Sequence, residues 1–156
     1  MVTLPHHRGY PHRPAAVQKR CGRGVVLRLV TVDHAPSSAA EARRELGADL
    51  ASQGVPAAVV DDAELVVSEL IGNAVRYGRP LPGNVLRVAW EVAAGSLLLK
   101  VTDGGGREAP RFREAGPSDV RGRGLAIVDA LARKWGVDRY ENGAGPVSTV
   151  WAELAV

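Results

Sequence analysis

Apolar residues recur along this chain at two spacings, and each spacing predicts a different secondary structure. The β-branched run at residues 25–32 (VVLRLVTV) favours a strand. The segment at residues 39–53 is rich in Ala, Glu, Arg and Leu, which favours a helix. Ser37 and Ser38 suit the cap before this helix, and Gly54 suits its end.

A second helix is predicted to begin at Asp61 or Asp62, either of which suits an N-cap, and to reach Tyr77. Its apolar residues return every three or four positions, as one buried face of a helix requires. Two prolines make residues 79–84 a loop. Two strands are predicted to follow, at residues 85–92 and 96–102.

Residues 104–123 combine Gly, Pro and charged residues without a period, which predicts a long loop of the kind that forms a lid. An amphipathic helix is then predicted from Gly124 to about Gly136, and a closing hairpin from residues 138–142 and 148–156. Because helices and hairpins are mixed rather than strictly alternating, we predict an α+β fold. Its expected form is a two-layer α/β sandwich, with a mainly antiparallel sheet and helices on one face.

The positive charge of the chain is concentrated at its start. The formal net charge is +3, yet residues 1–24 hold five Lys and Arg and no acid, so the remaining fifteen basic residues face seventeen acidic ones. Residues 1–24 are also rich in His and Pro, which predicts a disordered basic tail before a single domain at residues 25–156. The near-neutral domain argues against direct nucleic-acid binding. The alternative is that the basic tail binds nucleic acid, and the affinity would then fall steeply with salt and disappear when residues 1–24 are deleted.

No segment is apolar and long enough for a signal peptide or a bilayer span, so we expect a cytoplasmic protein without membrane contact. The single cysteine, Cys21, excludes an internal disulfide and a thiol-based zinc cluster.

Glu69 and Asn73 are four residues apart on the second predicted helix, so their side chains leave the same face. A carboxylate there can accept a proton, and an amide oxygen is a ligand that Mg²⁺ accepts while it keeps waters and bridges phosphates. Arg76, one turn further on, is a candidate phosphate contact. The alternative to a ligand site is that Glu69, Asn73 and Arg76 are ordinary polar side chains in contact with solvent.

Asp103 ends an apolar strand and precedes Gly104, Gly105 and Gly106. A fixed carboxylate can accept a hydrogen bond from an exocyclic amine such as that of adenine, and glycines let the backbone approach the ring. An ordinary Asp-Gly turn is the alternative. Thr149, in the last predicted strand, is a candidate to complete the same pocket with an inward hydroxyl. The alternative is that this β-branched residue only favours the strand conformation.

The run Arg121-Gly122-Arg123-Gly124-Leu125 leads directly into the third predicted helix. Unpaired N–H groups and the dipole at a helix N-terminus favour an anion, so a triphosphate is a natural ligand. Arg121 and Arg123 can add positive charge, while a glycine hinge between lid and helix is the alternative. The run is not a Walker loop, because no Gly-Lys-Ser/Thr follows.

Four motifs in this order resemble those of the GHKL ATPase superfamily and, within it, the anti-sigma-factor serine/threonine kinases of bacterial partner switching. The resemblance runs from about Val25 to the end of the chain. Residues 67–78 (VSELIGNAVRYG) resemble the N box, 101–106 (VTDGGG) the first glycine box, 121–128 (RGRGLAIV) the second, and 148–154 (STVWAEL) the closing strand.

The resemblance implies the Bergerat ATP-binding fold, with ATP and Mg²⁺ as cofactors and the long loop as a lid. It implies that Glu69 is the catalytic base and Asn73 the metal ligand. Asp103 would accept a hydrogen bond from adenine, with support from Thr149. The other positions of the implied nucleotide site are Arg76, Gly105, Arg121, Gly122, Arg123, Gly124 and Leu125.

The implied activity is phosphorylation of an anti-sigma-factor antagonist on serine or threonine. A sigma factor would be a further partner, and a homodimer is left open. A protein of another class is also compatible, namely a regulatory module whose bound ATP shapes a docking surface without turnover. An intact Glu69 favours the kinase, because phosphoryl transfer to a hydroxyl needs a proton acceptor.

Overall fold

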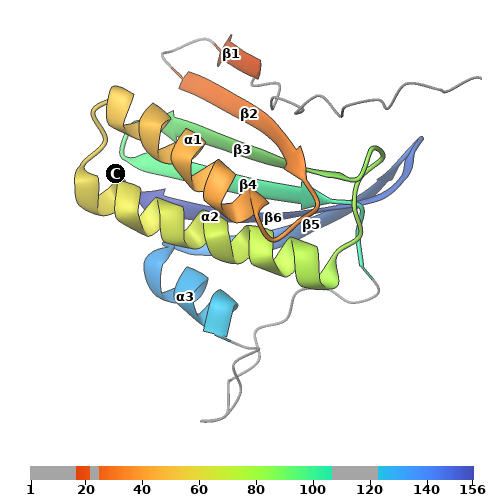
Figure 1. Cartoon of the computed structure of the whole chain (residues 1–156). Coiled ribbons are helices and arrows are strands. Elements are labelled where there is room, and N and C mark those ends of the chain that lie inside the picture. Colours follow the sequence, from red (N-terminus) through yellow and green to blue (C-terminus); the bar gives the residue numbers. More distant parts are fainter. Residues whose placement is uncertain (1–16, 22–24, 107–122) are drawn as a thin grey trace, which may run out of the picture.

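A computed structural model describes residues 17–21, 25–106 and 123–156. Within them, one antiparallel sheet with strand order β1-β2-β3-β4-β6-β5 carries helices on one face (Figure 1). The elements are β1 (Val17–Cys21), β2 (Val25–Asp33), α1 (Ser38–Ser52), α2 (Ala57–Tyr77), β3 (Val85–Ala93), β4 (Ser96–Asp103), α3 (Arg123–Leu131), β5 (Lys134–Asn142) and β6 (Gly145–Ala155).

The core lies between the sheet and the helices. Leu97, Leu99 and Val101 alternate along β4 toward the helices, as the two-residue period of a strand requires. Leu70 and Ile71 of α2 meet them in the same buried cluster. Helices α1 and α2 lie side by side, and α3 packs against α2 (Figure 1). The predicted α+β two-layer sandwich is confirmed.

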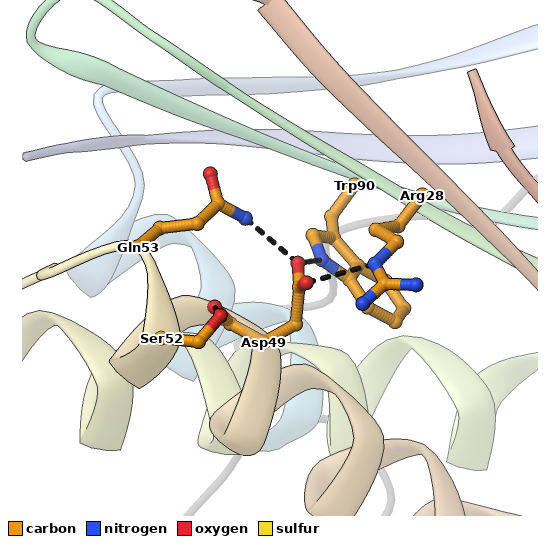
Figure 2. A network of polar contacts seen from close by, with 5 residues as sticks. All are labelled: Arg28, Asp49, Ser52, Gln53 and Trp90. Atoms are coloured by element: carbon orange, nitrogen blue, oxygen red, sulfur yellow. Dashed lines mark hydrogen bonds and ion pairs between the residues drawn. The ribbon is translucent and has the colours of Figure 1, made fainter. Parts of the chain in front are cut away.

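A buried carboxylate joins α1 to the sheet (Figure 2). Asp49 of α1 is 7% exposed, and it accepts hydrogen bonds from Arg28 Nε at 2.8 Å, Trp90 Nε1 at 2.7 Å and Gln53 Nε2 at 2.8 Å. Arg28 belongs to β2 and Trp90 to β3, so one side chain fixes α1 over two strands. The charge of Asp49 is compensated by the Arg28 guanidinium, which is what a buried ion requires.

The second helix begins earlier than the sequence pattern predicts. It begins at Ala57 with Pro56 at the N-cap, so Asp61 and Asp62 lie inside the helix and the predicted start is wrong. Proline presets a backbone angle that suits the start of a helix. The Pro56 carbonyl accepts from the backbone of Val59 and Val60, whose side chains pack against the core. Packing of this extra turn therefore decides where the helix starts.

The first helix begins as predicted, but its cap differs. Ser37 occupies the N-cap position without a side-chain capping hydrogen bond, whereas the Ser38 hydroxyl donates to the Asp33 carbonyl at 2.6 Å. Ser38 thus ties the end of β2 to the start of α1.

The third helix is shorter than predicted and ends at Leu131. Trp135, expected on that helix, belongs to β5, whose nine residues pair with β6. Trp135 lies opposite Ala152, packs against the core, and donates through Nε1 to Asp129 at 3.0 Å. A continuous ladder with β6 overrides the helical spacing of the apolar residues.

Val17–Cys21 lies in the segment predicted to be a disordered tail, but it forms β1 and pairs with Val25 to Leu29 of β2. The added strand satisfies backbone groups along the edge of β2, a gain that composition does not register. Residues 1–16 and 22–24 lie outside the described residues. The division into a tail and one domain at residues 25–156 stays a prediction.

Candidate functional site

Asp103 is held at the end of β4 by glycines. Its side chain is buried, and its Oδ1 accepts from the Gly105 N–H at 2.7 Å. Gly105 has φ +75°, a conformation that glycine adopts without strain. A Cβ at Gly78 would collide with the Asp103 carboxylate, and a Cβ at Gly104 would collide with the Pro80 carbonyl. These glycines bring the chain after α2 directly against the end of β4.

The environment of Asp103 shifts its titration. Burial raises the pKa of this carboxyl above its ordinary value of 3.8, while the Gly105 N–H and the charges of His34 and Arg139 oppose that rise. Because burial is the largest effect, the net pKa is raised. A buried carboxylate with one committed backbone donor still has acceptor capacity for a ligand.

A small hollow, open to solvent, lies beside this carboxylate. It is bounded by the C-terminal half of α2 on one side and by the inner face of the sheet on the other. The residues that line it include Asn73, Tyr77, Gly78, Asp103, Arg139 and Ser148.

Three of these lining residues form a row across adjacent strands. Asp103 of β4 is in register with Ser148 of β6, and Ser148 is in register with Arg139 of β5. Cross-strand partners on one face lie about 4.5–5.5 Å apart at Cβ, so the row presents an acid, a hydroxyl and a guanidinium side by side.

A second group of polar residues lies beside the hollow, where Glu69 and Asn73, one turn apart on α2, face the start of α3. A Cβ at Gly124, in the first turn of α3, would lie 2.5 Å from Glu69 Oε2 and 3.6 Å from Asn73 Oδ1. The carboxylate and the amide oxygen therefore meet at the N-terminus of α3. Asn73 also lines the hollow, so it links this cluster to Asp103.

Residues 32–151, more than half of the chain, match the family described as the histidine kinase-like ATPase domain. The chain belongs to this family. As a histidine kinase-like ATPase domain it binds ATP.

Among solved structures, the domain is similar to the histidine kinase AdeS of Acinetobacter baumannii, at 26% sequence identity and a TM-score of 0.34. The match covers 61% of this chain and 47% of that one, so the domain spans about half of the AdeS chain. No curated protein matches it. In the described parts of the chain, no helix combines the length and apolar character that crossing a membrane requires.

Several residues predicted for the nucleotide site of this ATPase domain lie together. Glu69, Asn73 and Gly124 converge at the start of α3, and Asp103, which accepts from the Gly105 N–H, lines the hollow. Their roles toward ATP stay predictions.

Arg76 follows Asn73 by one turn of α2 and is exposed. Its Nη2 donates to Asn73 Oδ1 at 3.3 Å, and its guanidinium lies 5.9 Å from the centre of the Tyr77 ring. It is therefore near the cluster and able to reach a phosphate group.

Thr149 does not lie in the hollow, and the expectation of an inward hydroxyl there is wrong by one residue. It is in register with Thr102, and the two hydroxyls are 2.7 Å apart on the sheet face that the helices do not cover. Side chains alternate along a strand, so the neighbouring Ser148 faces Asp103 instead. Both neighbouring residues carry a hydroxyl, and the strand register decides which of them faces the hollow.

Leu125 is buried, so its side chain packs in the core, and only its backbone is available near the start of α3. Arg123 begins α3, whereas Arg121 and Gly122 lie outside the described residues. The sequence analysis missed Gly78, Ser148 and Arg139, and alternation along the last two strands was the signal that could have found the latter two.

Across residues 17–21, 25–106 and 123–156, no three His, Cys, Asp or Glu side chains gather in a group that could hold a metal ion. The oxygens of Asn73 and Glu69 do share one small space beside Gly124. A Mg²⁺ ion carried by ATP needs few protein ligands, and an amide oxygen in this position fits that need.

Proposed function

We propose that this chain is an ATP- and Mg²⁺-dependent protein serine/threonine kinase of the anti-sigma-factor type, which phosphorylates an anti-sigma-factor antagonist. The observation that carries the proposal is the convergence of Glu69 and Asn73 at the N-terminus of α3, next to the hollow that contains Asp103. A proton acceptor, a metal ligand, an anion-binding helix end and an acceptor for the base are then arranged along α2.

Asp103 would accept a hydrogen bond from the exocyclic amine of adenine at the inner end of the hollow. Glu69 and Asn73 are one helical turn apart on α2, and both side-chain oxygens lie beside Gly124, so they would face the same end of the triphosphate. The phosphates would lie against the backbone N–H groups of Gly124 and Leu125, where the helix dipole favours negative charge.

Glu69 would take the proton from a serine or threonine hydroxyl of the substrate protein. The hydroxyl oxygen bonds to the γ-phosphorus, the bond from that phosphorus to the bridging oxygen of ADP breaks, and the proton moves to the Glu69 carboxylate. When bound through Asn73, Mg²⁺ supplies neutralisation of the phosphate charge. Arg76 is close enough to add a second positive charge.

A specific contact favours the alternative of an ATP-binding docking module with little turnover. Glu69 Oε2 lies against the first turn of α3, where an anionic carboxylate is stabilised and a phosphate would otherwise bind. A Glu69 held there is less available as a base, and ATP would then act by moving α3.

One experiment separates the two functions. The protein is incubated with γ-labelled ATP, Mg²⁺ and candidate antagonist proteins, and ATP affinity is measured in parallel. A kinase labels an antagonist, and Glu69→Gln lowers the rate at least about 100-fold, the scale of general base catalysis, while ATP affinity changes little. Asp61→Asn, an exposed carboxylate on the same helix, should leave the rate unchanged. Tight ATP binding without labelling would support the docking module.

The partners are part of the same proposal. An antagonist protein is the phosphate acceptor, a sigma factor binds the kinase separately, and the kinase acts in the cytoplasm without binding nucleic acid or membrane. Light scattering of the purified chain with and without ATP tests whether it forms a homodimer.

A further inference from the structure

Arg139 lies at the edge of the hollow in a fixed position relative to Asp103. The two residues belong to β5 and β4, on either side of β6, and Ser148 lies between them in register with both. Two strand spacings separate the backbones of β4 and β5 by about 9–10 Å. A short carboxylate and a long guanidinium can therefore reach neighbouring atoms on one edge of a flat ring.

The guanidinium of Arg139 is available to a ligand. Its side chain is exposed, and among the described residues it has no ion-pair or side-chain hydrogen-bond partner. Arginine presents five N–H donors and no acceptor, whereas an ionised aspartate offers only acceptors. The hollow thus has opposite hydrogen-bonding character at its two ends, with a hydroxyl of either character at Ser148.

This polarity matches the edge of adenine. The exocyclic amine of adenine is a donor, and the ring nitrogens N1 and N7 on either side of it are acceptors. We propose that Arg139 recognises the nucleobase by donating a hydrogen bond to one of these ring nitrogens, while Asp103 accepts from the amine. The inference rests on the proposed function in one respect, that the hollow at Asp103 is the site of the base.

The proposal predicts a preference among nucleotides. Guanine has a carbonyl oxygen in place of the exocyclic amine, and that acceptor would face the Asp103 carboxylate. Two acceptors without a shared proton leave a buried polar group unpaired, which disfavours binding. The contact of Asp103 with the amine therefore favours ATP over GTP. A contact of Arg139 with N1 would add to that preference, because N1 of guanine is a donor, whereas a contact with N7, an acceptor in both bases, would not.

The test combines a variant with base analogues. Calorimetric titrations with ATP, 1-deaza-ATP, 7-deaza-ATP and GTP are made for the wild type, Arg139→Ala and Arg87→Ala. Arg87 is an exposed arginine in register with Thr102 on the other face of the sheet, so it controls for loss of one positive charge. Thermal unfolding checks that each variant is folded.

In the wild type, one deaza analogue should bind about tenfold more weakly than ATP, the scale of one hydrogen bond to a charged group. Arg139→Ala should bind ATP about tenfold more weakly and lose the difference between ATP and that analogue, and Arg87→Ala should behave like the wild type.

The inference is overturned if Arg139→Ala binds ATP as tightly as the wild type. It is also overturned if the variant binds ATP weakly but still discriminates against the analogue to the same degree, because the arginine would then act only through the charge of Asp103. A wild type that binds no ATP would instead remove the proposed function, and the inference with it.

Discussion

The carboxylate of Asp103 occupies the space that a side chain at Gly78 would need. Gly78 follows the last residue of α2, and Asp103 is the last residue of β4, so this contact joins the two layers at the inner end of the hollow. The same Cβ would also lie 2.7 Å from the Ala74 carbonyl, which is backbone and cannot rotate away.

We therefore expect Gly78→Ala to lower both stability and ATP affinity. Overpacking against backbone typically costs about 1–3 kcal/mol, and the displaced Asp103 would lose its alignment with the base. Urea unfolding and ATP titration measure the two effects. Gly143→Ala is the matched control, since a Cβ there meets no atom within 4 Å. Wild-type affinity in Gly78→Ala would contradict the close packing.

Gly124→Ala should leave the stability of the fold nearly unchanged but lower the rate of phosphoryl transfer. The nearest atom to the new Cβ is Glu69 Oε2, the mobile end of a side chain, so the fold can adapt. Gly124 is the second residue of α3, so the gain from the higher helix propensity of alanine is smaller than the value of about 1 kcal/mol for a helix interior. The free energy of unfolding, measured in urea, should be unchanged or slightly higher. The rate of phosphoryl transfer to the antagonist protein should fall, because the Glu69 carboxylate is displaced. Full activity with ordinary stability would mean that the position of Glu69 is not critical.

Ser148 and Thr149 should respond differently to loss of their hydroxyls. Ser148→Ala removes a group from the hollow and should weaken ATP binding severalfold with little effect on stability. Thr149→Val breaks the 2.7 Å contact with Thr102 and should cost about 1 kcal/mol of stability while ATP binding stays unchanged. The reverse pattern in titration and denaturation would show that the register is shifted by one residue.

Binding of adenosine should weaken in acid at a higher pH than an ordinary aspartate would produce. Burial raises the pKa of Asp103 above 3.8, and only the ionised carboxylate accepts the hydrogen bond from the amine. Affinity should therefore fall as the pH drops through that raised pKa. Adenosine is used because it carries no phosphate that titrates, and Asp103→Asn should give weak binding without this pH dependence.

The raised pKa of Asp103 affects folding stability in the opposite direction, because stability decreases as the pH rises whereas adenosine affinity increases. Between the unfolded and folded pKa values of Asp103 the native state binds more protons, so its contribution to stability decreases as the pH rises through that window. Asp103→Asn should remove this decrease in urea titrations. A wild type and variant with parallel stability curves would contradict the raised pKa.

Loss of the Asp49 carboxylate should unfold the domain more easily without changing the site. Asp49→Ala leaves the Trp90 N–H and the Arg28 guanidinium without their acceptor, which costs about 2–4 kcal/mol. Asp49→Asn keeps an acceptor oxygen and should cost less. Glu45→Ala, at an exposed position on α1, is the control. Urea midpoints give the stability, and ATP affinity measured well below the transition should equal that of the wild type.

The hydrophobic pattern alone determined most of the elements and the fold class. The strands at Val25–Asp33, Val85–Ala93 and Ser96–Asp103 follow from local alternation and β-branched runs. The four-residue spacing of Glu69 and Asn73 likewise fixes their common face as soon as the segment is a helix. These features depend on neighbouring residues in the chain, so they are legible without a structure.

Register and packing across the layers were decided only by the tertiary structure. Trp135 pairs in β5 although its spacing suits a helix, and Ser148 rather than Thr149 faces Asp103 because β6 pairs with β4 in one register. Arg139 reaches the hollow for the same reason. A shift of one residue moves every side chain of a strand to the other face, and long-range pairing sets that register. The types of functional group in the site could therefore be predicted from the sequence, whereas the strand register in the folded protein determines which side chains line the hollow.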